Sequence, residues 1–313
     1  TVTIKSGTIQ NATGGSTGGS TGDGIGGGNV SNNTTVTIEG GTIETAQGGQ
    51  SYGDYDAGDG IHSDSGLTIS GKATIVSAIG GKDDSDSSSN AGHGIYSGGD
   101  LTIKDGTTIG SWNTDGTPDT ATGALGGDAA AGEQGGSGIY SDGTLFISEN
   151  ATITNAKGGE GKAFGGDGIR GNGSLFIQGG TIGTAQGGDS TDDTGTGIGG
   201  KGIHSDGTLT ISGGEIQQAT GGDATGTGGI GGDGIRSDGN LKIEGKANIG
   251  TAQGGNGKFT GGYGINSTSS NDLTISSEAK IGTAQGGDGK TTGGSGIYSN
   301  DKLTISDSAT ITN

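Results

Sequence analysis

The apolar residues of this chain recur in three short segments per repeat, always in the same order. The first is a Gly-Ile pair, the second is a Leu/Val-x-Ile triplet, and the third contains a single isoleucine. Together these positions hold 29 of the 32 isoleucines and eight of the nine leucines. In chain order the three sets are Ile25, Ile61, Ile95, Ile139, Ile169, Ile203, Ile235, Ile265 and Ile297; then Ile4, Ile38, Ile69, Ile103, Ile147, Ile177, Ile211, Ile243, Ile275 and Ile305; then Ile9, Ile43, Ile75, Ile109, Ile153, Ile182, Ile216, Ile249, Ile281 and Ile311. Self-similarity at this period indicates a solenoid, whose units are covered by their neighbours.

Each apolar segment is predicted to be a short strand. In the stretch from Leu209 to Ser212, apolar and polar residues alternate, so the apolar ones share one face. The segments end in Ser-Asp-Gly or Gly-Gly turns, which supply the positive φ angles that sharp corners need. The pattern therefore predicts an all-β fold, a single parallel β-helix over residues 1–313. It has about ten coils of three short strands, and the usual preference of such crossovers makes it right-handed.

The length of the repeat varies almost wholly in one place. From Gly-Ile to the third isoleucine the distance is nearly constant, whereas the glycine-rich stretch that follows changes length, so successive Gly-Ile pairs lie 30 to 44 residues apart. This predicts loops on one edge of the solenoid, either stacked into an ordered layer or disordered, since ordering glycine is entropically unfavourable. In the fourth repeat Trp112 stands where other repeats carry alanine, before the longest insert, and we expect it to anchor that insert.

Composition narrows the class of protein. With 81 glycines and a net charge of -19, composition alone is near that of a disordered chain, but the periodicity overrules it. There is no cysteine for disulfides, thiolate catalysis or metal ligation. The acidic balance disfavours nucleic acid as a partner, and no apolar run reaches the roughly 20 residues that a membrane-spanning helix needs. These features favour an extracellular or cell-surface protein without membrane insertion.

The residue after each Gly-Ile pair is predicted to point outward and to stack from coil to coil. Flat rings and guanidinium groups at β spacing can lie against sugar rings, so this row suits a polysaccharide or a host glycan. The candidate carbohydrate-binding residues are His62, Tyr96, Tyr140, Arg170, His204, Arg236 and Tyr298. A stacked row of this kind can equally serve only to stabilise the solenoid.

Two further pairs lie in neighbouring coils. Phe146 and Phe176 are expected to point outward together, either as a hydrophobic contact patch or as a local cross-strand pair. Asp206 and Asp238 occupy equivalent turns, where two carboxylates about 5 Å apart would repel each other and a calcium ion would relieve the repulsion. The alternative is that aspartate stands there because it accepts turn conformations. Calcium is thus the one candidate cofactor, and the fold requires none.

The sequence predicts no enzyme. A β-helix polysaccharide lyase would need clustered carboxylates and a basic proton acceptor on one face, and here the few basic residues are dispersed. The histidines, His62, His93 and His204, are never within a short metal-ligand spacing.

Parts of the repeat resemble known glycine-rich surface proteins. The stretches 6–28 and 38–49 resemble repeats of large surface proteins from Gram-positive gut bacteria. The stretch 201–214 is similar to the parallel β-helix carbohydrate-binding family found in clostridia, and the resemblance covers essentially the whole chain. Membership of that family would imply polysaccharide binding with bound calcium.

The leading hypothesis from the sequence is a non-enzymatic extracellular β-helix, the shaft of a bacterial surface adhesin or fibre. The first alternative is a carbohydrate-binding module that uses the outward row. The second is a subunit of a self-assembling filament: the sequence begins at a second apolar segment and stops after a third, and no capping element is visible. Uncapped coils expose strand edges, which favours end-to-end self-association.

Overall fold

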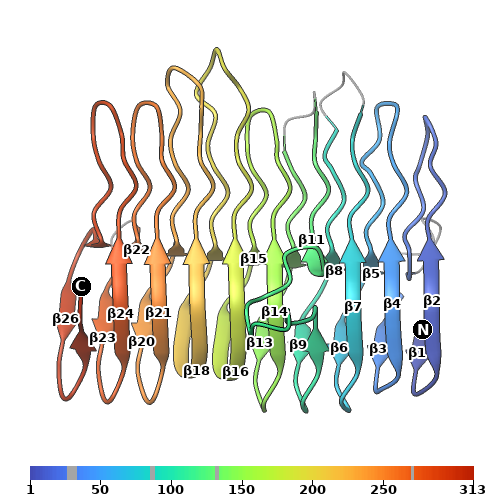
Figure 1. The fold of residues 1–313 in the computed structure, drawn as a ribbon, viewed down its shortest axis with the longest axis horizontal. Coiled ribbons are helices and arrows are strands. Elements are labelled where there is room, and N and C mark those ends of the chain that lie inside the picture. Colours follow the sequence, from blue (N-terminus) through green and yellow to red (C-terminus); the bar gives the residue numbers. More distant parts are fainter. Residues whose placement is uncertain (27–33, 85–88, 131–133, 269–270) are drawn as a thin grey trace.

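The chain folds as a parallel β-helix, as the sequence predicts. The computed structural model describes residues 1–26, 34–84, 89–130, 134–268 and 271–313, and all regular structure in these ranges is β. Figure 1 shows the coils side by side in a row, with the long loops projecting from one side of every coil. None of the described ranges forms a helix that could cross a membrane.

The strands fall into three parallel ladders, which we name after their sequence. The Gly-Ile ladder contains β5 (Ile61–Ser63), β8 (Ile95–Ser97), β12 (Ile139–Ser141), β15 (Ile169–Gly171), β17 (Ile203–Ser205), β19 (Ile235–Ser237), β22 (Ile265–Ser267) and β25 (Ile297–Ser299). The Leu-x-Ile ladder contains β1 (Val2–Ile4), β3 (Val36–Ile38), β6 (Leu67–Ile69), β9 (Leu101–Ile103), β13 (Leu145–Ile147), the first parts of β16 (Leu175–Gln186) and β18 (Leu209–Thr220), β20 (Leu241–Ile243), β23 (Leu273–Ile275) and β26 (Leu303–Ile305).

The third, or Thr-Ile, ladder completes each coil. It contains β2 (Thr8–Thr13), β4 (Thr42–Gln47), β7 (Thr74–Ile79), β10 (Thr108–Ile109) with β11 (Gly123–Leu125), β14 (Thr152–Lys157), the second parts of β16 and β18, β21 (Asn248–Gln253), β24 (Lys280–Gln285) and β27 (Thr310–Ile311). In β16 and β18 the second and third faces form one continuous strand. Gly180 and Gly214 turn the corner there with φ angles of 80° and 81°.

The ladders are in register, so each apolar residue stacks on its counterpart in the next coil. Ile61 pairs with Ile95, Leu67 with Leu101 and Ile43 with Ile75. Away from the two ends of the solenoid these side chains are at most 1% exposed. Because each coil needs only a few buried side chains when its neighbours cover them, a chain of this composition can still build a continuous core.

The loops are stacked above a layer of closely packed glycines, which we call the glycine neck. Its members are Gly15, Gly22, Gly49, Gly58, Gly81, Gly92, Gly127, Gly136, Gly159, Gly166, Gly188, Gly200, Gly222, Gly232, Gly255, Gly262, Gly287 and Gly294. They come alternately from the outgoing and returning limb of each loop, and each N–H donates to the carbonyl of the member before it at 2.8 to 3.0 Å. From Gly49 onward, an added Cβ would lie only 1.8 to 2.1 Å from a carbonyl oxygen, so no side chain fits. Of the two alternatives for the loops, the loop residues that the structure describes therefore show the ordered layer.

The long insert of the fourth repeat is placed differently from the expectation. The alanine position is occupied by Ala124, which pairs with Ala78 and Ala156, so the assignment of Trp112 to that position was wrong. The insert leaves the coil after β10 and returns at β11, inside the strand rather than after it.

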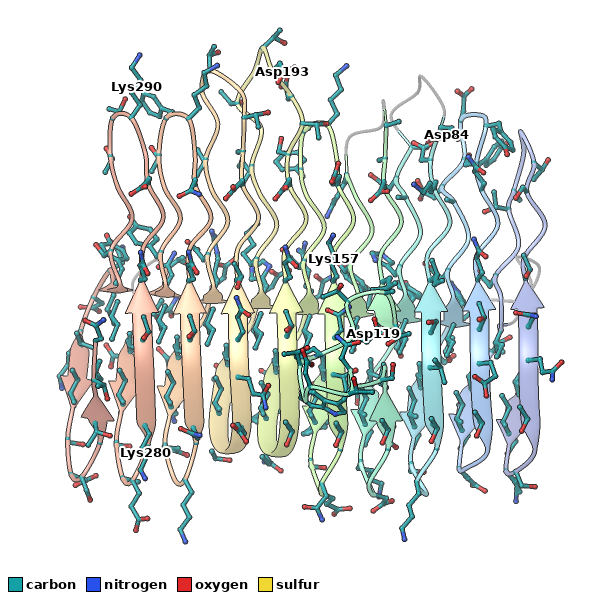
Figure 2. The ribbon with its side chains drawn as sticks, viewed as in Figure 1. Asp84, Asp119, Lys157, Asp193, Lys280 and Lys290 are labelled. Carbon is teal, nitrogen blue, oxygen red and sulfur yellow. The ribbon has the colours of Figure 1, made fainter. Side chains whose placement is uncertain are left out.

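The insert folds over the Thr-Ile ladder. Trp112 forms a bridge with Pro118, and both side chains lie against Gly183 of β16, where an added Cβ would be 3.1 Å and 3.0 Å from their atoms. Asn155 of β14 donates to the carbonyl of Thr122 at 3.0 Å. Figure 2 shows the insert, with Asp119, in front of these strands. Trp112 thus holds the insert down, and the insert interrupts what would otherwise be a flat face.

Candidate functional site

The residues after the Gly-Ile pairs form one row along the solenoid, which we call the outward row. His62, Tyr96, Tyr140, Arg170, His204, Arg236, Asn266 and Tyr298 pair in consecutive register. Asn266 separates the last member from the others, and Tyr298 instead stacks on Tyr263 with ring centroids 4.6 Å apart. The structure therefore brings six of the seven candidate residues together and leaves Tyr298 apart.

The rings of this row face one another rather than the solvent. Tyr96 lies 4.7 Å from His62 and 5.6 Å from Tyr140 between ring centroids, with interplanar angles of 26° and 8°. His93 stacks on Tyr140 at 4.5 Å, and the guanidinium of Arg170 lies 5.7 Å from the centre of the same ring. Parallel rings spaced along the rod cover one another's faces. This part of the row therefore offers mainly ring edges and hydroxyl groups to a ligand.

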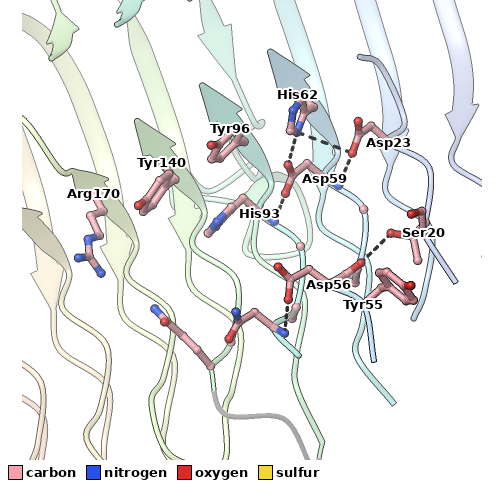
Figure 3. A pocket seen from close by; sticks show the side chains of 18 residues that line it. Ser20, Asp23, Tyr55, Asp56, Asp59, His62, His93, Tyr96, Tyr140 and Arg170 are labelled. Atoms are coloured by element: carbon pink, nitrogen blue, oxygen red, sulfur yellow. Dashed lines mark hydrogen bonds and ion pairs between the residues drawn. The ribbon is translucent and has the colours of Figure 1, made fainter. Parts of the chain in front are cut away.

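A groove of about 530 Å³ lies beside the row, at the foot of the loops. Its lining comes from five successive coils, and Figure 3 shows Asp23, Asp56 and Asp59 at one end and Arg170 at the other. Tyr96 and Tyr140 lie between them. The groove is a concave, polar and aromatic surface, and it brings together residues that are far apart in the sequence.

A second row of functional residues was missed by sequence reasoning. It is formed by the residue before each Gly-Ile pair, which we call the inner row: Asp23, Asp59, His93, Ser137, Asp167, Lys201, Asp233, Tyr263 and Ser295. One oxygen of each aspartate accepts the backbone N–H of the next member, as from Asp59 to Asp23 at 2.9 Å. In Asp59, Asp167 and Asp233 the other oxygen also binds a residue of the outward row, as Asp59 binds Nδ1 of His62 at 2.6 Å. The recurrence of Asp-Gly-Ile in four repeats was the available signal.

The surroundings raise the pKa of two of the three histidines and lower the pKa of the third. Burial disfavours the charged form of His62, but Asp59, then Asp23 and Asp64, outweigh it and raise the pKa to about 9. Burial likewise opposes the charge of His204, but Asp167 and Asp238 raise its pKa. In contrast, burial lowers the pKa of His93, whose Nδ1 accepts the N–H of Ser137 at 2.8 Å.

The two charged histidines are poorly suited to catalysis or metal binding. His62 contacts Asp59 through Nδ1 and Asp64 through Nε2, and His204 contacts Asp167 and Asp206 in the same way. A protonated ring held by carboxylates on both nitrogens offers no lone pair to a proton or to a metal ion. The geometry of these sites is that of buried ion pairs.

The repulsion between Asp206 and Asp238, which motivated the calcium hypothesis, is offset by cations of the chain itself. Both carboxylates face Nε2 of His204, at 3.1 Å and 3.5 Å. Asp206 also binds Arg170 at 2.8 Å, and Asp238 binds Arg236 at 2.7 Å. Burial would raise the pKa of Asp238, but His204 and Arg236 hold it well below its usual range.

We accordingly expect calcium to have no effect on the stability of this region. The thermal unfolding midpoint in excess EDTA should equal the midpoint in added calcium chloride, because His204, Arg170 and Arg236 already neutralise the carboxylates. Circular dichroism melts in the two buffers, at matched ionic strength, measure this. A higher midpoint in calcium that disappears in the double variant Asp206→Asn/Asp238→Asn would restore calcium as a ligand of this pair.

Stability is expected to fall between about pH 6.5 and pH 9. The folded-state pKa of His62 is raised above its ordinary value of 6.5, so its stabilising contribution is complete below 6.5 and is lost as pH rises through about 9. The pKa of His204 is shifted in the same direction. Unfolding midpoints across this range should decline, and His62→Gln should reduce the slope. The control His93→Gln should leave the slope unchanged because the pKa of His93 is lowered, and an equal effect of both variants would contradict the assignment.

Phe146 and Phe176 pair in register on the Leu-x-Ile ladder, away from the groove. Their rings are stacked, with centroids 5.2 Å apart and an interplanar angle of 11°, and both side chains are half-buried. The local cross-strand pair is therefore present, and a role of this pair in contacting a partner remains a prediction.

No family model matches the chain, and neither a curated protein nor a solved structure shows significant similarity to it.

Proposed function

We propose that this protein is a non-enzymatic structural rod, the shaft of an extracellular adhesin or fibre on a bacterial surface. The observation that carries the proposal is the glycine neck, whose hydrogen bonds run without a break from Gly15 to Gly294. Three in-register ladders run beside it. Every coil is thus joined to the next on the loop side as well as on its three faces, which suits a stiff spacer.

The chemistry of the surface supports the same proposal. A net charge of -19 keeps such rods soluble and apart, and the absence of cysteine makes the fold independent of redox conditions. His62 and His204, the charged histidines, are engaged in ion pairs with carboxylates on both ring nitrogens. These features fit a load-bearing surface element and not a catalyst.

Two measurements test the proposal. Small-angle X-ray scattering should give a rigid, flattened particle that extends about 45 Å along the coil axis, for ten coils at about 4.8 Å per coil, with the loops widening it across that axis (Figure 1). An antibody against the chain should label intact cells of the source organism as strongly as permeabilised cells. Labelling that requires permeabilisation would exclude a surface shaft, and a scattering profile of a flexible chain would exclude a stiff one.

A second candidate function, carbohydrate binding, is favoured by the groove beside the outward row. Tyr55 lines it and is 55% exposed, so its ring is open to a sugar, whereas Tyr52 is 58% exposed and lies outside the lining. If the groove binds a glycan, Tyr55→Ala should remove a signal on a glycan array that Tyr52→Ala retains. Equal binding by the two variants would place the signal elsewhere.

A further inference from the structure

The charges of the groove are distributed unevenly along its length. Asp23, Asp56 and Asp59 lie at one end, and His62 is the one charged histidine among them (Figure 3). At the other end, the guanidinium of Arg170 binds Asp206 at 2.8 Å and lies 3.8 Å from Asp167. The cation at that end is therefore matched by carboxylates, whereas the acidic end has three carboxylates for one imidazolium.

The carboxylates of the acidic end are not fully balanced by His62. The ring contacts Asp59 at 2.6 Å but lies 3.8 Å from Asp23. Burial, and then the neighbouring charge of Asp59, raise the pKa of Asp23 to about 6 despite His62, which is the behaviour of crowded carboxylates. Asp56 is exposed and uses Oδ1 to accept the backbone N–H of Asn90 at 2.7 Å. A further positive charge would be stabilised here.

The same end also carries an open aromatic ring. Tyr55 also lines the groove and is more than half exposed, so a ligand that extends past Asp56 could contact its ring. Asp23, Asp59 and His62 lie close enough together to hold a metal ion, but His62 already contacts a carboxylate through each ring nitrogen, so a metal would have to displace one of these contacts. The lining extends over five coils, so at about 4.8 Å per coil the groove is about 20 Å long and fits an extended ligand.

We propose that this groove binds an oligomer of amino sugars, with an ammonium group at the carboxylate of Asp56, at the acidic end of the groove. This inference rests on the second candidate function, carbohydrate binding, and adds the class of sugar. The ammonium group takes the place of the missing counter-charge, and Tyr55 covers the adjacent ring of the ligand. The hydroxyl groups of the following sugars meet the edges of Tyr96 and Tyr140, whose own hydroxyls bind Asp142 at 2.6 Å and 3.1 Å.

Isothermal titration calorimetry with two matched ligands tests the proposal. One is a glucosamine hexamer, in a mildly acidic buffer that protonates its amines, and the other is the N-acetylglucosamine hexamer in the same buffer, which has the same backbone and no charge. The charged hexamer should bind about tenfold more tightly, which is the effect of one additional half-buried ion pair.

Matched variants separate the groove from the general acidity of the protein. Asp56→Asn keeps an oxygen for the N–H of Asn90 and removes one charge, so it should reduce the affinity for the charged hexamer about tenfold and leave the neutral hexamer unchanged. Asp54→Asn removes the same charge from an exposed neighbour outside the groove and should change neither affinity.

Each outcome is decisive. Equal affinity for the two hexamers would overturn the amino-sugar proposal and leave carbohydrate binding in place. If neither hexamer binds and no neutral glycan binds either, the amino-sugar proposal and carbohydrate binding are both overturned. Equal losses in Asp54→Asn and Asp56→Asn would show attraction to the acidic surface as a whole and would also overturn the proposed site.

Discussion

Replacing Gly222 with alanine is expected to reduce the free energy of unfolding by more than about 4 kcal/mol, the range reached only by severe steric or buried-charge defects. Gly222 belongs to the glycine neck, where its N–H donates to Gly200 at 2.8 Å. An alanine Cβ would lie 1.9 Å from the carbonyl oxygen of Gly188 and 2.5 Å from its carbon. Both atoms are backbone and belong to the preceding coil, so relief requires the outgoing limbs of two neighbouring loops to separate and the hydrogen bonds through Gly200 to break.

Denaturant unfolding, with hydrogen exchange to locate the opening, measures this effect. Exchange matters because coils of a solenoid can open locally, and the amides of neighbouring neck glycines should lose protection first. The control is Gly293→Ala, whose added Cβ would lie 3.7 Å from the nearest atom, and it should change stability by less than about 1 kcal/mol. Similar stability of the two variants would mean that the neck is not closely packed in solution.

Asp167→Ala should have the second largest effect, a loss of about 3 to 5 kcal/mol, because it leaves a buried charge without its partner. The side chains of Asp167 and His204 are only 3% and 5% exposed, and they contact each other at 2.9 Å. Burial would raise the pKa of Asp167, but Lys201 and then His204 hold it well below its usual range. Its contribution is therefore present above the ordinary pKa of aspartate and is lost as the pH falls below it.

The comparison with Asp206→Asn makes this prediction specific. Asp206 contacts the same two cations, His204 and Arg170, but its side chain is 31% exposed, so its loss should cost less than about 1 kcal/mol. Chemical denaturation at neutral and acid pH gives both values. Equal losses in the two variants would mean that the number of ion pairs, and not burial, determines their contribution.

The ladders were predictable because the sequence encodes them directly. Isoleucine recurs where a side chain points inward, and an inward position in a parallel β-helix pairs with its own counterpart, as Ile169 does with Ile203. The outward row was predictable for the same reason, since Tyr96 and Tyr140 each come one residue after such an isoleucine and therefore pair with each other.

Other features depend on contacts that spacing cannot reveal. Counting residues along the fourth repeat placed Trp112 at the alanine position, because an insertion inside a strand and one after it lengthen the repeat equally; only the pairing of Ala124 distinguishes them. The glycine neck could not be predicted, because the sequence does not reveal that the two limbs of a loop approach within hydrogen-bonding distance. The ion pair of Asp167 with His204 joins residues 37 positions apart, each of which the sequence places at an ordinary turn or edge.

The glycine neck also separates what holds the protein together from what it displays. Below it, the coil must repeat with little change; above it, each loop is already closed by the time it leaves the neck, so its length has no mechanical consequence for the coil. Outside the fourth repeat, whose extra length lies in the insert between β10 and β11, spacings of 30 to 36 residues between anchors are accommodated on the same rod. New recognition sequences could therefore be inserted at a loop tip one coil at a time. The fold is thus a modular display scaffold with a fixed spacing between successive loops.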